Sequence, residues 1–269
     1  GSFELSKEEM QIGMKYALSY LGAELPKGSF TEATTDISED VFTLDLSKVG
    51  FNEAAQKALQ KIVTTIKNSP AYQQNEYTEA GRFIMLTLNS SYHYFEIIGM
   101  PENIESFRSL HSFSEARKTR VINSAISDVN RLIEVSNATR AEEIAYISAE
   151  GRGEFEDNSF QLEEFEVLDY MPNGQFRYGL YDINGNLKAA ADSRLTRAGK
   201  PAKCQWCHEL GIQPFFTDPP VLPGESFLSR EEFLDIRSEF TLFMAGHRSE
   251  RNSEIDFTER QHHALMEHI

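Results

Sequence analysis

The chain has 269 residues, 40% of them hydrophobic and 25% charged, which is enough to form the core of one large domain or of two ordinary ones. Its 42 acidic and 26 basic residues give a net charge of −16, and this average field would repel DNA or RNA, so nucleic-acid binding is excluded. No stretch approaches the roughly 18 consecutive apolar residues of a membrane-spanning helix.

Helical periodicity dominates the sequence up to about residue 150. Ser6 and Glu9 have the spacing of a capping box, and apolar residues follow them at helical intervals. Gly99 stands where a helix would end, and Pro101 follows it. The predicted helices cover residues 6–21, 51–67, 78–98, 102–110, 114–135 and 139–148.

The period changes to alternation after Gly151 and Gly153. Asn173-Gly174 and Asn184-Gly185 are the two-residue signals of tight hairpins. They separate three runs of alternating apolar residues, which we expect to pair as an antiparallel three-stranded meander. The predicted strands cover residues 160–168, 176–181 and 187–191.

The end of the chain returns to a helical pattern. A stretch containing five prolines and glycines, from Pro214 to Gly224, should be extended. Ser229 then caps a helix that runs to about Ala245, and a last helix covers residues 256–268. The fold class is therefore α+β, with a helical N-terminal body, the meander, a loop carrying the two cysteines, and C-terminal helices. The predicted regions are residues 1–150, mainly helical, and residues 151–269, unless the two form one continuous domain.

One motif carries specific chemistry, Cys204-Gln205-Trp206-Cys207-His208. The chain has only two cysteines, and they stand three positions apart with a histidine directly after them. This spacing lets two thiols add to the two vinyl groups of one haem, while the imidazole ligates the iron from the same side. The motif therefore predicts covalent haem attachment. Trp206, between the cysteines, would either pack against the edge of the haem or anchor the motif in the core beside the hairpins, and the second role is the favoured one.

Residues 204–208 match the attachment motif of c-type cytochromes. The wider stretch from Tyr178 to Glu209 resembles exported bacterial proteins that carry a single late CxxCH motif, and it is faintly similar to the cytochrome P460 group. The resemblance implies haem c bound at Cys204 and Cys207, His208 as the proximal iron ligand, and electron transfer or redox sensing with a redox partner protein. A distal ligand would come from downstream; the candidates are Met244, His247, Met266 and the pair His262 and His263.

The sequence departs from these families in two ways. In small cytochromes c the motif lies near the N-terminus and on a helix, whereas here it begins at residue 204 and precedes a proline-rich stretch. The cytochrome P460 group also has a lysine cross-linked to the haem, and no lysine of this chain can be assigned that role.

Two other interpretations of the motif remain open. Cys204, Cys207 and His208 could bind zinc with a fourth ligand from His247, His262, His263 or His268, or the two cysteines could form a disulfide. Either would make the chain a non-haem binding or interaction protein. No residues that would handle a substrate are identified, so the sequence assigns no enzymatic activity to the chain.

The chain begins with Gly1 and Ser2 rather than methionine, which indicates a trimmed start. Thioether attachment of haem takes place outside the reducing cytosol. We therefore expect an exported protein, periplasmic or anchored at the surface as a lipoprotein, whose signal segment has been removed.

The segment from Glu154 to Glu166 holds six acidic residues and no basic one. Such a run is typical of a cation-binding or partner-steering face, or of a strand face in water. The solvated strand face is the favoured interpretation here.

Overall fold

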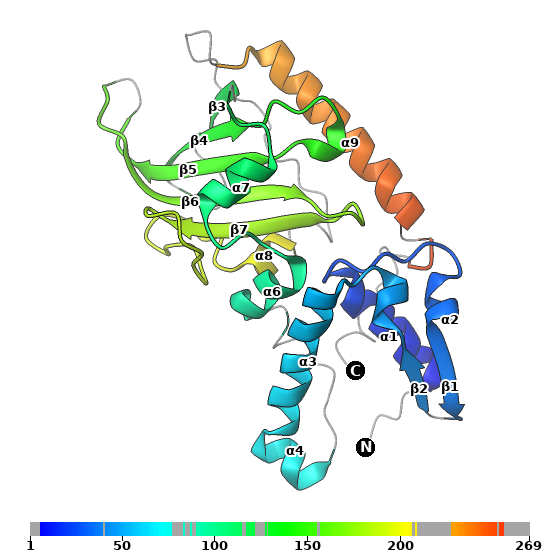
Figure 1. Cartoon of the computed structure of the whole chain (residues 1–269). Helices are drawn as coiled ribbons and strands as arrows, with labels where there is room; N and C mark the ends of the chain where they lie inside the picture. Colours follow the sequence, from blue (N-terminus) through cyan, green and yellow to red (C-terminus); the bar gives the residue numbers. More distant parts are fainter. Residues whose placement is uncertain are drawn as a thin grey trace. The chain divides into compact units, whose positions relative to one another are not determined.

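The structure is a computed structural model of the whole chain, and it has mixed α+β architecture (Figure 1). None of the described helices is both long enough and apolar enough to cross a membrane. The side chains of residues 121, 240, 244 and 247–251 are not described. The described residues are 6–39, 41–76, 83, 87, 90–114, 117–121, 127, 129–154, 157–205, 208, 227–251 and 253–255.

The chain forms two compact units, and each is built from several separate segments. Unit 1 comprises residues 1–99, 172–175 and 246–269, and unit 2 comprises residues 100–171 and 176–245. The predicted boundary near residue 151 falls inside a strand of unit 2.

Unit 1 is mainly helical, in agreement with the sequence. Ser6 and Glu9 form the predicted capping box, in which the Ser6 hydroxyl accepts from the Glu9 N–H at 3.2 Å and Glu9 accepts from the Ser6 N–H at 2.8 Å. Gly99 ends a helix in the left-handed conformation, as predicted. The elements of unit 1 are α1 (Lys7–Ser19), α2 (Ser29–Ala33), β1 (Thr34–Ser38), β2 (Val41–Leu44), η1 (Leu46–Val49), α3 (Glu53–Lys67), α4 (Pro70–Asn75) and α6 (Ser91–Ile98).

The core of unit 1 gathers residues from all three of its segments. Leu18, Phe30 and Ile62 belong to one buried cluster, which also includes Ile255 from near the end of the chain. The turn at residues 172–175 contributes hydrogen bonds, in which the side chains of Asn173 and Gln175 donate to the carbonyl oxygens of Ala23 and Tyr20 at 3.1 and 3.0 Å.

Unit 2 is built on a five-stranded sheet in the order β3-β4-β5-β6-β7, with every neighbouring pair antiparallel (Figure 1). The strands are β3 (Arg117–Val121), β4 (Asn130–Val135), β5 (Tyr146–Arg152), β6 (Gln161–Tyr170) and β7 (Phe176–Asp182). The helices are α7 (Ile104–Leu110), η2 (Ala141–Glu143), α8 (Pro201–Gln205) and α9 (Arg230–Arg251), of which residues 230–245 belong to this unit.

The helices predicted over residues 114–135 and 139–148 are wrong, because β3, β4 and β5 occupy this part of the chain. The apolar residues there are mostly valine and isoleucine, which pack well on a pleated sheet. Strand β4 has hydrogen-bonded neighbours on both sides, β3 on one and β5 on the other. Tertiary pairing therefore outweighs the helical spacing of the sequence.

The predicted meander forms only in part. The connection between β6 and β7 contains Asn173-Gly174, but it is a loop of residues 171–175 rather than the expected two-residue hairpin, because Tyr170 pairs with Phe176. The third predicted strand, residues 187–191, is wrong, because these residues form no ladder and Leu187 makes only an isolated bridge to Tyr181. The chain then leaves the sheet edge, and the N–H of Ala191 bonds to the carbonyl oxygen of Gly199 instead.

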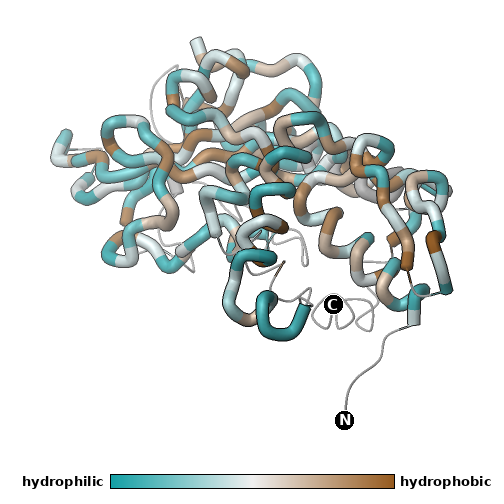
Figure 2. Tube along the Cα trace, turned by 60° about the horizontal axis from the view of Figure 1, so that its bottom comes forward, coloured by the Kyte–Doolittle hydropathy of each residue, from teal (hydrophilic) through white to brown (hydrophobic). Residues whose placement is uncertain are grey.

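One face of the five-stranded sheet carries the side chains that matter for the candidate site. Paired residues of an antiparallel sheet lie on the same face, so the register places Glu150, Glu164, Glu166, Leu168 and Tyr178 together; we call this the α8 face. Ala191 and Ala198 pack on this face against Leu180, and the first turn of α9 packs beside Val135. Hydrophobic and hydrophilic segments alternate along the chain trace, as expected of elements that bury one side (Figure 2).

Candidate functional site

Cys204, the first cysteine of the motif, lies in helix α8 rather than in the predicted loop. It packs against an aromatic cluster on the α8 face, and its Sγ is 3.8 Å from the carbonyl oxygen of Lys200, one turn earlier in the chain. We define the aromatic cluster by Tyr146, Leu168, Tyr170, Phe176 and Tyr178, which come from β5, β6 and β7.

His208, the last residue of the motif, is held by the same cluster. Its ring stacks on Tyr178, with the ring centroids 6.3 Å apart and the ring planes 28° from parallel, and its Nδ1 atom is buried. Cys204 and His208 are therefore both set against one aromatic wall, which β6 and β7 position through the pairing of Leu168 with Tyr178.

The other residues predicted for a haem site are not placed against this wall by any described contact. Trp206, Cys207, Met266, His262, His263 and His268 lie outside the described residues. Met244 and His247 belong to helix α9, but their side chains are not described. The distal ligand therefore stays a prediction, as do the zinc and disulfide interpretations.

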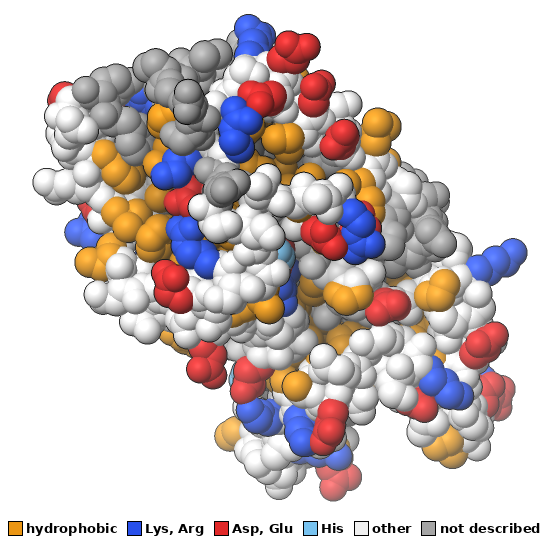
Figure 3. Space-filling view, turned by 45° about the horizontal axis from the view of Figure 1, so that its top comes forward, with side chains coloured by type: hydrophobic (Ala, Val, Ile, Leu, Met, Phe, Trp, Pro, Cys, Tyr) orange, Lys and Arg blue, Asp and Glu red, His pale blue; other side chains and the backbone are white. Residues whose placement is uncertain are grey.

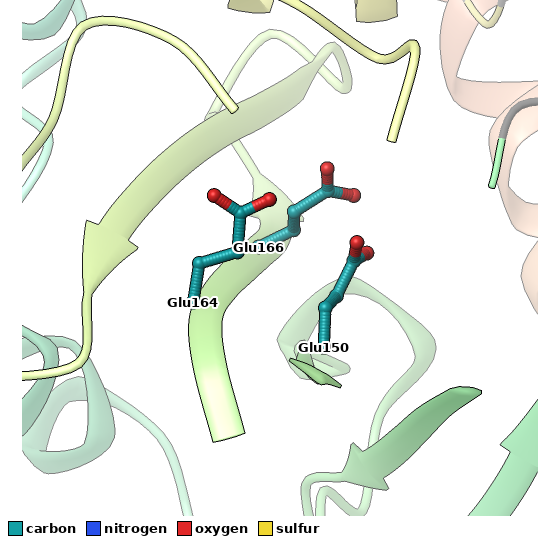
Figure 4. A group of neighbouring side chains, drawn as sticks. All are labelled: Glu150, Glu164 and Glu166. Carbon is teal, nitrogen blue, oxygen red and sulfur yellow. The ribbon is translucent and has the colours of Figure 1, made fainter. Parts of the chain in front are cut away.

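A second group of chemistry-bearing side chains lies further along the α8 face, and the sequence analysis missed it. Glu150 from β5 and Glu164 from β6 are cross-strand partners, and Glu166 is the next residue of β6 on that face. One carboxylate oxygen from each lies within 4.8 Å of the others. Figure 4 shows the three side chains rising from neighbouring strands, with the carboxylates of Glu150 and Glu166 turned toward each other.

Two of these carboxylates are completely buried. The side chains of Glu150 and Glu164 have no exposed surface, whereas that of Glu166 is 19% exposed. The predicted solvated face at residues 154–166 is therefore wrong for Glu164. On the molecular surface in Figure 3, acidic and basic side chains are intermingled.

Two cations accompany the three carboxylates. Lys188 Nζ lies 2.5 Å from Glu164 Oε2, which also accepts from the N–H of Asp192 at 2.9 Å. Arg131 Nε lies 2.9 Å from Glu150 Oε1, and Arg131 Nη1 lies 3.8 Å from Glu166 Oε2. Glu164 is therefore the best-neutralised member of the group.

The environment of Glu150 favours its protonated form. Burial is the largest cause, and the neighbouring Glu166 carboxylate adds to it, so that the pKa of Glu150 rises from 4.5 to about 9 although Arg131 acts in the opposite direction. One oxygen each of Glu150, Glu164 and Glu166 is buried with no hydrogen-bond partner among the described residues: Glu150 Oε2, Glu164 Oε1 and Glu166 Oε1.

A sequence signal for this group existed. Glu164, Glu166 and Leu168 alternate along one strand, so the two glutamates share a face with an apolar residue. Their counter-charges could not be found in the same way, because Arg131 falls in a predicted helix and Lys188 in a predicted strand that does not form.

Searches against protein-family models, curated proteins and solved structures find no match to this chain.

Proposed function

We propose that this protein is an exported monohaem c-type cytochrome-like protein that transfers electrons or senses redox state. In this proposal haem c is attached to Cys204 and Cys207 by thioether bonds, and His208 is the proximal iron ligand. The observation that carries it is that Cys204 and His208, four residues apart, contact the same aromatic cluster. A thiol and an imidazole that face one apolar wall are what a planar macrocycle attached at this motif requires.

The described residues fit such a group. Cys204 is only partly buried, and Leu168, Phe176 and Tyr178 supply an apolar surface beside it. The Nδ1 atom of His208 is buried, which suits ligation through the other ring nitrogen, Nε2.

When bound, a haem iron accepts and gives back one electron, and the surrounding residues set how easily it does so. Tyr178 would fix the plane of the His208 ring by stacking. Leu168 and Phe176 would exclude water, and Tyr146 would stay neutral, because burial raises the pKa of its phenol.

Electron transfer needs a redox partner protein. The net charge of −16 favours a partner with a basic face, since charge complementarity raises the rate of encounter. Lowering the ionic strength should therefore speed electron transfer to a basic carrier protein.

The test is the mass and visible spectrum of protein expressed in the periplasm of a host that attaches c-type haem. We expect a covalent haem adduct with a Soret band. We also expect His208→Ala to lose the native spectrum and His93→Ala, a histidine outside the motif, to keep it. An unmodified mass without a Soret band would refute the proposal. Bound zinc, or a mass short by two protons, would then assign the motif to a metal clip or a disulfide.

A further inference from the structure

The charges of the carboxylate group on the α8 face, Glu150, Glu164 and Glu166 with Arg131 and Lys188, do not balance if all three glutamates are ionised. Glu150, Glu164 and Glu166 would carry three negative charges, whereas Arg131 and Lys188 supply two positive ones. Asp192 contributes its backbone N–H, and its carboxylate is engaged by Arg194. An uncompensated charge beside side chains with no exposed surface is strongly unfavourable, so one more positive charge is required.

We propose that Glu150 and Glu166 hold one proton between them at neutral pH, so that the group is a buried proton-binding site. The proton would be carried by one carboxylate and donated to the other, since carboxylate oxygens of the two residues lie within 4.8 Å of each other. The oxygens of the pair without a described hydrogen-bond partner are Glu150 Oε2 and Glu166 Oε1. Both are buried, so a single proton would pair them and would also balance the charge.

Glu164 already has partners of its own, so the proton is assigned to the other two carboxylates. Its Oε2 accepts from Lys188 and from the N–H of Asp192, and both interactions favour the ionised carboxylate. Asp182, the cross-strand partner of Glu164 on β7, is exposed and bonds to its own turn, so it does not contribute.

A divalent metal ion fits this site less well than a proton does. A divalent ion would add two positive charges where one is needed, and the group would become net positive. Lys188 and Arg131 already lie 2.5–3.8 Å from the carboxylates that would be its ligands. A proton also has a route in and out, since Glu166 is 19% exposed and its carboxylate lies within 4.8 Å of that of the buried Glu150. The inference stands independently of haem attachment.

The test is infrared spectroscopy of the full chain with ¹³C-labelled glutamate. At pH 7 we expect the carbonyl stretch of one neutral, buried glutamic acid, which shifts with the label and disappears as the pH rises through about 9. Because the pair shares a single proton, Glu150→Gln and Glu166→Gln should each abolish this band. Replacing either carboxylate of the pair leaves two negative and two positive charges in the group. The other carboxylate of the pair is then ionised and no neutral acid remains.

Glu163→Gln is the matched control. Glu163 neighbours Glu164 on β6 but points to the other face, where it pairs with Arg152 at 3.0 Å. This variant should keep the band. The proposal is overturned if the parent protein has no such band at pH 7, or if the band survives in Glu166→Gln. It is also overturned if added Ca²⁺ or Mn²⁺ removes the band in proportion to its binding.

Discussion

Two buried acidic groups lie on opposite faces of the same sheet and differ in how well they are neutralised. On the face opposite the motif, Asp169 is 1% exposed, but it is paired with the guanidinium of Arg177 and with Nε2 of His111 at 2.9 Å. On the α8 face, Glu150 is as deeply buried and shares the one guanidinium of Arg131 with Glu166. A complete set of partners makes the first group structural, whereas the deficit at the second makes it titratable.

The titration of Glu150 should appear in stability. The unfolded chain releases this proton near pH 4.5, whereas the folded protein keeps it to about pH 9, so the free energy of unfolding falls as the pH rises between these values. One proton gives a slope of at most about 1.4 kcal/mol per pH unit.

Glu150→Gln removes this proton, so its stability relative to the parent protein should increase steadily from pH 5 to pH 8. Urea unfolding of haem-free protein, followed by the fluorescence of the single tryptophan, Trp206, measures the difference. Glu163→Gln should give a curve parallel to that of the parent, and a parallel curve for Glu150→Gln would contradict the assignment.

Spacing alone was enough to find the candidate motif, because Cys204, Cys207 and His208 lie within five consecutive residues. The carboxylate group could not be found in this way. It depends on Arg131, Glu150 and Lys188 meeting from three separate segments. The register of the sheet brings Arg131 beside Glu150, and the chain beyond β7 brings Lys188 to Glu164.

Among the elements, helix α9 shows how a local signal and a distant contact can coincide. Ser229 and Glu232 form a capping box, in which the Ser229 hydroxyl accepts from the Glu232 N–H at 3.2 Å and the Glu232 carboxylate accepts from the Ser229 N–H at 2.9 Å. Arg117 of β3 also binds this carboxylate, and together with Ser229 it lowers the pKa of Glu232 to about 2. The sequence predicted this helix start without the contact to β3.

Ser229→Ala should cost about 1 kcal/mol of stability, because the cap is lost and the N–H of Glu232 loses its acceptor. The change can be read from the urea midpoint of unfolding. Thr241→Ala is the control in the same helix, since Thr241 only donates back to the carbonyl oxygen of Arg237, and it should be neutral or slightly stabilising. Equal losses in the two variants would rule out the cap as the cause.

Elements stabilised by local signals were predicted well, and those stabilised by distant pairing were not. Helices α1 and α3 carry caps and a continuous apolar stripe, and both form as expected. Strand β4 carries Leu132 and Ile133 in succession, one for each face of a sheet, which a helical spacing also accommodates. Its pairing with β5 decides between the two, and that pairing is not a local property.

At the scale of the molecule, the two units are interleaved along the chain. Unit 1 needs Ile255 for its core, and Lys15 pairs with the nearly buried Glu254 at 2.9 Å. It also needs the turn at residues 172–175, whose side chains bond to Ala23 and Tyr20. Composition gives no sign of such a division, because each later segment is too short to bias the average.

A fragment of residues 1–99 should therefore not fold cooperatively, although it contains most of the helices of unit 1. Heating it should give a broad, non-cooperative loss of helical circular dichroism, while the full chain unfolds with a distinct transition. A sharp transition in the fragment, close to that of the full chain, would show that the later segments are dispensable.

The interleaving also determines the order in which the protein can be completed on the ribosome. Unit 2 ends at residue 245, before the last segment of unit 1 has been made. At translation rates of about 5–20 residues per second, residues 1–99 wait about 7–30 s for the rest of their core. During this interval their apolar side chains remain available to chaperones, because the segments that would cover them have not yet been synthesised.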